Sequence, residues 1–204
     1  MGFLDIFRFR RRSPIRDSQA LAKFIDENSA FLVQKAIYEY SRARAGHYSK
    51  VLFAEPEFHQ AVEQSRWRSY PLGLVMVTEV ADNVLHSNST ANRRSDLDKL
   101  MGVILGVFDG YPVPAALGEA AWSKLRGELE QRLKLIGLHP PKRAIDIPEP
   151  FAKLYFELMP IHEKLRGRDF MTTSNYLKVT LANIHHELTE RIDIPAITGA
   201  LRAG

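Results

Sequence analysis

Four polar residues in the segment TEVADNVLH have the types and the spacing that could carry chemistry. Glu79, Asp82, Asn83 and His86 recur at intervals of three or four residues, so on a helix they share one face. Carboxylates and an imidazole on one face could bind a metal ion or exchange a proton. The same pattern also fits a buried helix that leaves the core and turns a polar face outward or into a cleft. We expect the second arrangement, without a bound metal.

A histidine near the C-terminus offers a further candidate ligand. In the segment IHHELTE, His186 and Glu190 are one helical turn apart, but Glu190 stands where the zinc signature His-Glu-x-x-His needs its second histidine. Di-iron bundles carry Glu-x-x-His on two helices, and that pair occurs nowhere in the sequence. A metal site joining His86, His162 and His186 therefore requires three separate helices to meet.

Two other segments combine basic and aromatic residues, SRARAGHYSK at 41–50 and RWRSY at 66–70. If they lie side by side, their cations would form an anion site for a phosphate or a lipid headgroup. The alternative interpretation makes Trp67 a core anchor with solvated arginines beside it. The candidate anion-binding residues are Arg42, Arg44, Lys50, Arg66 and Arg68.

Common catalytic signatures are missing from the sequence. The chain has no cysteine, which excludes disulfides, thiolate metal sites and cysteine nucleophiles. It also lacks a Gly-x-Ser-x-Gly elbow, a P-loop and a Gly-x-Gly-x-x-Gly turn. These absences favour a protein that is not an enzyme and needs no cofactor.

The N-terminal segment MGFLDIFRFRRR differs from the rest of the chain in charge. Residues 1–16 carry five arginines and one acidic residue, which gives +4, and the formal charge of the whole chain is also +4. Residues 17–204 are therefore neutral overall. On a helix, the large apolar residues near the start fall within an arc of about 160°. The candidate membrane-binding residues are Phe3, Leu4, Ile6, Phe7, Arg8, Arg10, Arg11 and Arg12.

An apolar helical face beside arginines is typical of a helix that lies in a bilayer interface. In pattern, these twelve residues resemble the short amphipathic membrane-targeting segments of some bacterial peripheral proteins, such as the topological specificity factor of the Min cell-division system. The resemblance implies attachment to the inner face of an anionic membrane. The apolar run is too short, and wrongly placed, for a secretory signal. An inert basic tail and an arm that binds nucleic acid or a partner stay open as alternatives.

The apolar residues of the body recur mostly at helical spacing, which predicts an all-α domain. We expect a single-domain bundle of six or seven helices, preceded by the short amphipathic N-terminal helix. Its parts would be a basic head at 1–16 that does not contact the core, a helical domain at 17–192 and a short C-terminal tail at 193–204. The expected helices span about 18–45, 55–70, 72–85, 96–109, 115–137, 149–165 and 170–192, with Pro71 kinking or breaking the chain between the second and third.

These features suggest a non-enzymatic accessory or adaptor protein, peripheral on the cytoplasmic face of an anionic membrane. Its partners would be that membrane, a protein and in some cases a lipid, whereas the neutral body argues against nucleic acid. One alternative is a helical metal-binding protein or enzyme that uses Glu79, Asp82 and His86, with His186 as a further ligand. Another is a lipid- or quinone-binding bundle, suggested by the apolar runs at 72–77 and 100–108.

Overall fold

A computed structural model describes residues 13–87, 91–160 and 169–203. The predicted membrane-binding residues 3–12 and His162 lie outside this part of the chain. The helices are α1 (Ser18–Ala45), α2 (Ser49–Leu52), α3 (Pro56–Leu85), α4 (Arg93–Asp109), α5 (Glu119–Ile136), α6 (Glu149–Glu157), α8 (Phe170–Arg191) and α9 (Ile194–Ala203). The prediction of an all-α single-domain bundle is confirmed. Among the described residues, no helix is long and apolar enough to cross a membrane.

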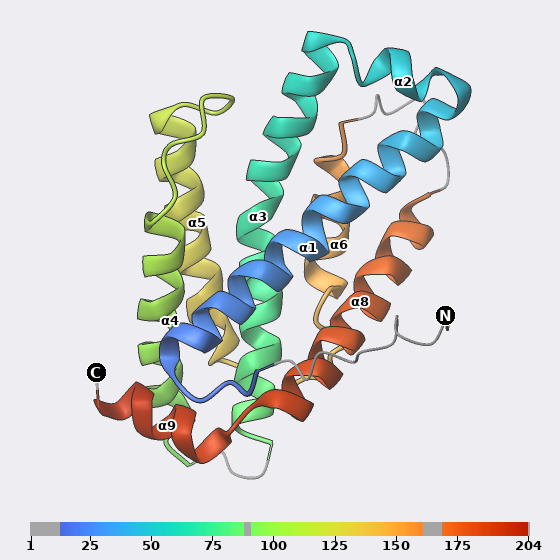
Figure 1. The fold of residues 1–204 in the computed structure, drawn as a ribbon. Helices are drawn as coiled ribbons and strands as arrows, with labels where there is room; N and C mark the ends of the chain where they lie inside the picture. The colour runs from blue at the N-terminus through green and yellow to red at the C-terminus, as the bar shows by residue number, and fades with distance from the viewer. Residues whose placement is uncertain (1–12, 88–90, 161–168, 204) are drawn as a thin grey trace, which may run out of the picture.

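Helix α3 lies at the centre of the bundle (Figure 1). It contacts α1, α4, α5, α6 and α8, and every residue from 69 to 86 is buried. The apolar segment at 72–77 therefore forms the middle of the core, as the sequence predicted. In Figure 1, α4 and α5 flank α3 on one side, α6 and α8 flank it on the other, and α9 lies across one end.

Pro71 does not break this central helix, because α3 continues without interruption from Pro56 to Leu85. The prediction of two separate helices was therefore wrong. Proline removes one backbone donor, which destabilises an isolated helix. Here Pro71 is buried with its neighbours Tyr70 and Leu72, and this packing offsets the missing hydrogen bond.

The long helix α1 packs obliquely across α3 and is the predicted helix 18–45. The Asp17 side chain caps its N-terminus by accepting a hydrogen bond from the Ala20 amide at 2.7 Å. Where the two helices cross, Gly73 allows their backbones to approach closely. A Cβ atom at this position would lie 2.8 Å from the Ser29 carbonyl oxygen, so only glycine fits.

The two ends of the described chain meet beside the bundle. Ile15 forms a parallel bridge with Ile192, in which the Ile15 amide donates to the Arg191 carbonyl and the Asp193 amide donates to the Ile15 carbonyl, both at 2.9 Å. Ile15 is buried in the core. The expectation that residues 1–16 make no contact with the core is therefore wrong for Ile15.

Residues 194–203 form helix α9 instead of the short tail that the sequence suggested. Ile197 and Leu201 are buried, and the helix contacts α4 and α1. Ten residues with only two deeply buried apolar side chains give a weak sequence signal. The helix is fixed to the bundle by these contacts and by the charged side chain of Arg202, described below.

Candidate functional site

The four polar residues of α3 are buried, not turned to solvent. Glu79 is 2% exposed, Asp82 0%, Asn83 7% and His86 4%. We expected this face to turn outward or into a cleft, and the outward alternative is wrong, because α4, α5 and the segment after α5 cover this end of α3. The four side chains also divide between two neighbouring environments. Asp82 and His86 enter a cluster of charges, whereas Glu79 lies in the wall of a cavity.

In the first environment, Asp82 forms an ion pair with Arg93 at the start of α4. Arg93 donates to Asp82 Oδ2 from Nε at 2.9 Å and from Nη2 at 2.6 Å. The same guanidinium also donates to the carbonyl oxygen of His139 at 2.7 Å and to that of Ile136 at 3.3 Å. Arg93 therefore joins α3 and α4 to the C-terminal end of α5.

His86 bridges Asp82 to a second carboxylate. Its Nδ1 lies 3.0 Å from the Asp82 carbonyl oxygen and 3.1 Å from Asp82 Oδ1, and its Nε2 lies 3.4 Å from Asp96 Oδ2. Arg202 of α9 then pairs with Asp96 through two hydrogen bonds, at 2.8 and 2.7 Å. We call Asp82, His86, Arg93, Asp96 and Arg202 the charge cluster. It connects α3, α4 and α9 through groups of alternating charge.

The two ring nitrogens of His86 both face acceptors, so the doubly protonated ring satisfies the most contacts. Burial opposes a charge on this ring, but the carboxylates of Asp82 and Asp96 outweigh it and raise the pKa of His86. The hydrogen bonds from Arg202 lower the pKa of Asp96 against the effect of burial. Asp82, His86 and Asp96 are buried and paired with opposite charges, while Arg202 closes the cluster at the surface, where its side chain is 48% exposed, and this arrangement suits a structural clamp.

Glu79 lies about one turn before Asp82 on α3, and its neighbours are different. It lies in the wall of a cavity of about 380 Å³ between α3, α5 and α6. Its Oε1 is 3.4 Å from Lys142 Nζ and 3.7 Å from His139 Nε2. A well-formed hydrogen bond is shorter, about 2.7–3.2 Å. Among the described residues, Oε1 has no hydrogen-bond donor in good geometry. Asn83 positions this segment by donating to the Lys142 carbonyl at 2.6 Å.

Burial raises the pKa of the Glu79 carboxyl, and the nearby cations Lys142 and His139 only partly offset this effect. Apolar side chains form the rest of the cavity wall: Val75, Leu135, Ile136, Pro150, Phe151 and Leu154. We call this space, with Glu79, Arg132, His139 and Lys142 in its lining, the Glu79 cavity. A carboxyl oxygen without a hydrogen bond among the described residues, in a cavity with apolar walls, is a candidate contact for a small molecule.

Of the candidate metal ligands that the structure describes, Asp82 and His86 are in contact, but Glu79 and His186 do not join them. His186 is exposed on α8. His86 and Glu79 are buried near the C-terminal end of α3, and each has different neighbours. Within residues 13–87, 91–160 and 169–203, no group of three or more metal-binding side chains is close enough to hold an ion.

The candidate anion-binding residues have different neighbours. Arg44 pairs with Asp169, and Arg66 pairs with Glu63 at 2.6 Å while its guanidinium lies 5.5 Å from the ring centre of Trp67. Arg42 and Lys50 are exposed near the end of α1 and in α2, and Arg68 lines a separate pocket beside α5.

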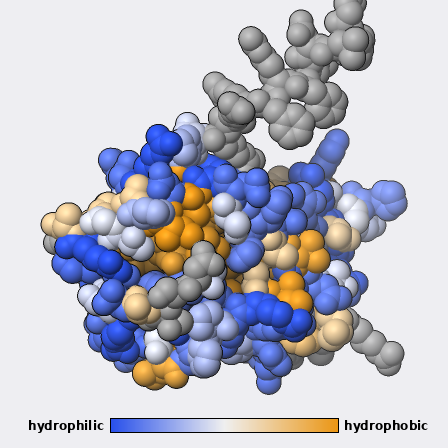
Figure 2. All heavy atoms as spheres, turned by 90° about the horizontal axis from the view of Figure 1, so that it is seen from below, coloured by the Kyte–Doolittle hydropathy of each residue, from blue (hydrophilic) through white to orange (hydrophobic). Residues whose placement is uncertain are grey.

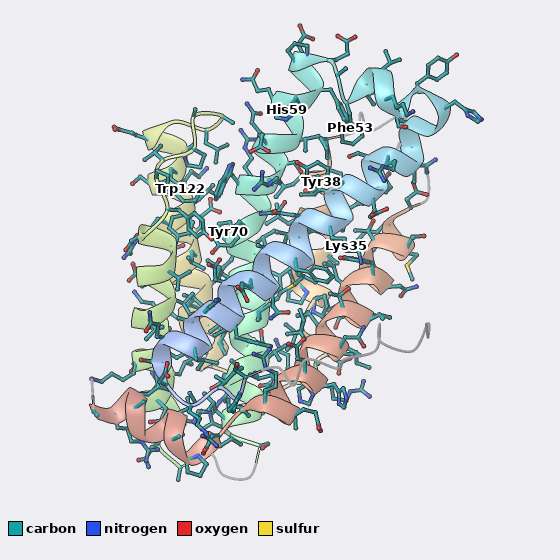
Figure 3. The ribbon with its side chains drawn as sticks, viewed as in Figure 1. Lys35, Tyr38, Phe53, His59, Tyr70 and Trp122 are labelled. Atoms are coloured by element: carbon teal, nitrogen blue, oxygen red, sulfur yellow. The ribbon has the colours of Figure 1, made fainter. Side chains whose placement is uncertain are left out.

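Trp67 belongs to an aromatic cluster between α3 and the α4–α5 pair, where Tyr70 and Trp122 also lie (Figure 3). Tyr70 and Tyr111 both donate hydrogen bonds to Asp26 of α1, at 2.6 and 2.9 Å. Burial, followed by the hydrogen bond to Asp26, raises the pKa of Tyr70. These contacts order the core between α1, α3 and α4, and the sequence carried no signal for the role of Asp26.

A groove of about 800 Å³ runs between α1 and α8 and begins beside Ser13. Phe24 and Phe31 supply apolar surface along it, and Phe31 is 48% exposed. Glu27 and Arg191 add charges of both signs. Seen from below, patches of hydrophobic residues interrupt the largely hydrophilic surface (Figure 2).

Sequence reasoning missed the residues that complete both environments of α3. Arg93 falls between the expected helices at 72–85 and 96–109, Asp96 falls at the start of the second of them, and Arg202 falls in the expected tail. His139 and Lys142 flank the Pro140–Pro141 pair, which signalled only the end of a helix. No local spacing relates these positions to α3, because helix packing brings them together.

Comparisons with protein-family models, with curated proteins and with solved structures found no match for this chain.

Proposed function

We propose that this protein is a non-enzymatic helical adaptor that attaches to the cytoplasmic face of an anionic membrane through residues 1–12 and binds a protein partner with its helical body. The observation that carries the proposal is the division of charge. The first 16 residues hold the entire net charge of +4, and the remaining 188 are neutral. Each basic residue near an anionic bilayer contributes about 1 kcal/mol of attraction.

The helical body supports an adaptor more than an enzyme. In the charge cluster, the ionisable side chains of α3 pair with buried or half-buried partners. The groove between α1 and α8 starts at Ser13, next to the segment that would bind the membrane. A partner helix with apolar side chains for Phe24 and Phe31 would fit this groove.

Membrane attachment is tested by sedimentation with anionic vesicles. Arg10→Glu/Arg11→Glu/Arg12→Glu should weaken binding at least tenfold, because each reversal replaces attraction by repulsion. Phe3→Glu/Phe7→Glu should release the protein as well, because it removes apolar burial. The matched control is Lys35→Glu/Lys99→Glu/Lys153→Glu on the exposed surface of the body. All variants should melt at the wild-type temperature. Equal binding of the head and body variants would contradict the proposal.

Partner binding is tested by capture from solubilised membranes. Phe31→Asp places a charge in the groove, whereas Val179→Asp places one on α8 outside the residues that line it. We expect a protein that co-purifies with the wild type and with Val179→Asp to be reduced at least fivefold with Phe31→Asp. Equal capture by both variants would place the partner elsewhere on the body.

A further inference from the structure

The Glu79 cavity has two properties that point to a ligand. Its volume of about 380 Å³ lies at the lower end of the range of small-molecule sites, about 300–1,000 Å³. Glu79 is 2% exposed, and its Oε1 lacks a well-placed donor among the described residues. Buried acceptors are normally hydrogen-bonded, because leaving one unpaired costs about 1–3 kcal/mol. A ligand that donates to Oε1 would remove this cost.

The charges around the cavity restrict what the ligand can be. Arg132 is paired with Glu128 at 3.1 Å, and Lys142 lies opposite Glu79, so the charged groups of the lining nearly balance. A charged ligand would add an unpaired charge to a buried site, which is costly. A neutral hydroxyl group avoids this cost. It can donate to Glu79 Oε1 and accept a hydrogen bond from Lys142 Nζ or His139 Nε2.

The apolar walls decide what carries the hydroxyl group. The cavity lining includes Pro150 and Phe151 from the start of α6 and Leu135 and Ile136 from the end of α5. These side chains offer flat and aliphatic surface on which an aromatic ring can pack. Leu135 is 55% exposed, which places it at the mouth of the cavity.

We propose that the Glu79 cavity binds a small neutral aromatic alcohol, of the phenol or hydroquinone class, with its hydroxyl group donating to Glu79 Oε1 and its ring between Phe151 and Leu135. This binding activity belongs to the body of the protein and does not depend on membrane attachment.

The test measures the binding of three probes to the full-length protein by equilibrium dialysis. 2-Naphthol carries the hydroxyl group, naphthalene lacks it, and 2-naphthoate replaces it with an anion. We expect 2-naphthol to bind at least tenfold more tightly than either of the other two. Equal binding of naphthol and naphthalene would overturn the role of Glu79. Preference for naphthoate would show an anion site instead.

Variants locate the binding. Glu79→Leu removes the acceptor and should weaken naphthol binding at least tenfold while leaving naphthalene unchanged. Leu135→Trp should block the mouth and abolish binding of both probes. Its matched control is Leu138→Trp, at a position 70% exposed and outside the cavity lining, which should bind both probes as the wild type does. If Leu135→Trp binds naphthol as tightly as Leu138→Trp does, the site is not this cavity. That comparison decides the proposal even if Glu79→Leu does not fold.

Discussion

The charge cluster and the Glu79 cavity differ sharply although they share one helix. Asp82 and His86 face α4, where Arg93 pairs with Asp82 and Asp96 lies 3.4 Å from His86, and Arg202 of α9 pairs with Asp96 in turn. Glu79 is only one turn away but faces the segment after α5, where the nearest cations are at 3.4 and 3.7 Å. Equally buried acidic residues of one helix face therefore have different roles.

Burial alone does not show whether an ionisable residue is structural or functional. The hydrogen-bond partners of the residue distinguish the two cases. A buried charge with well-placed partners is a fixed part of the fold, whereas a buried acceptor without a donor can accept a hydrogen bond from a ligand. On this basis the charge cluster, where Asp82 accepts two hydrogen bonds from Arg93, holds helices together, and we propose the Glu79 cavity as the ligand site. Three predictions test this difference.

The largest effect is expected for Asp82→Ala. This change leaves Arg93, whose side chain is 12% exposed, without its carboxylate and should lower the free energy of unfolding by about 3–5 kcal/mol. Urea denaturation measures it. The control is Asp98→Ala, which breaks the exposed Arg94–Asp98 pair and should cost less than about 1 kcal/mol. Similar small losses in both variants would mean that the charge cluster does not hold the fold.

A smaller, pH-dependent effect is expected for His86→Gln. Because the folded protein raises the pKa of His86, the protonated ring stabilises the fold fully below its unfolded pKa of about 6.5. This stabilisation is lost as the pH rises through the folded pKa. The wild type should therefore lose stability above about pH 6.5, and His86→Gln should lose less over the same range. Parallel pH profiles of the unfolding free energy would contradict a charged His86.

The smallest effect is expected for Glu79→Gln, within about 1 kcal/mol at neutral pH and in the stabilising direction. Because burial raises the pKa of Glu79, ionisation of this residue costs stability above its unfolded pKa of about 4.3. The cost grows as the pH rises from the unfolded pKa to the folded pKa and is constant above it, and the neutral amide of the variant would remove it. Unfolding measured between about pH 4 and 7 should show a flatter profile in the variant. A loss above about 2 kcal/mol would place Glu79 with the charge cluster.

Much of the helical fold follows from the sequence, because apolar spacing and capping residues are local signals. The helix at 18–45 and the buried segment at 72–77 were predicted from such patterns. The continuity of α3 through Pro71 was not, because it depends on packing against other helices. The candidate residues Glu79, Asp82 and His86 could be selected from their spacing. Their separation into two environments could not, because Lys142 reaches Glu79 and Arg93 reaches Asp82 only in the folded chain.

The bridge between Ile15 and Ile192 holds the start of the described chain against the bundle, which would limit how the body is oriented relative to a surface bound by residues 1–12. Arg12 lies three positions before Ile15, a reach of about 10 Å when the chain is fully extended. A surface bound by residues 1–12 would therefore lie close to the end of the bundle where α8 meets α9. If residues 1–12 bind a surface as proposed, this short connection would turn that end of the body toward the surface and the opposite end, with α2, away from it (Figure 1).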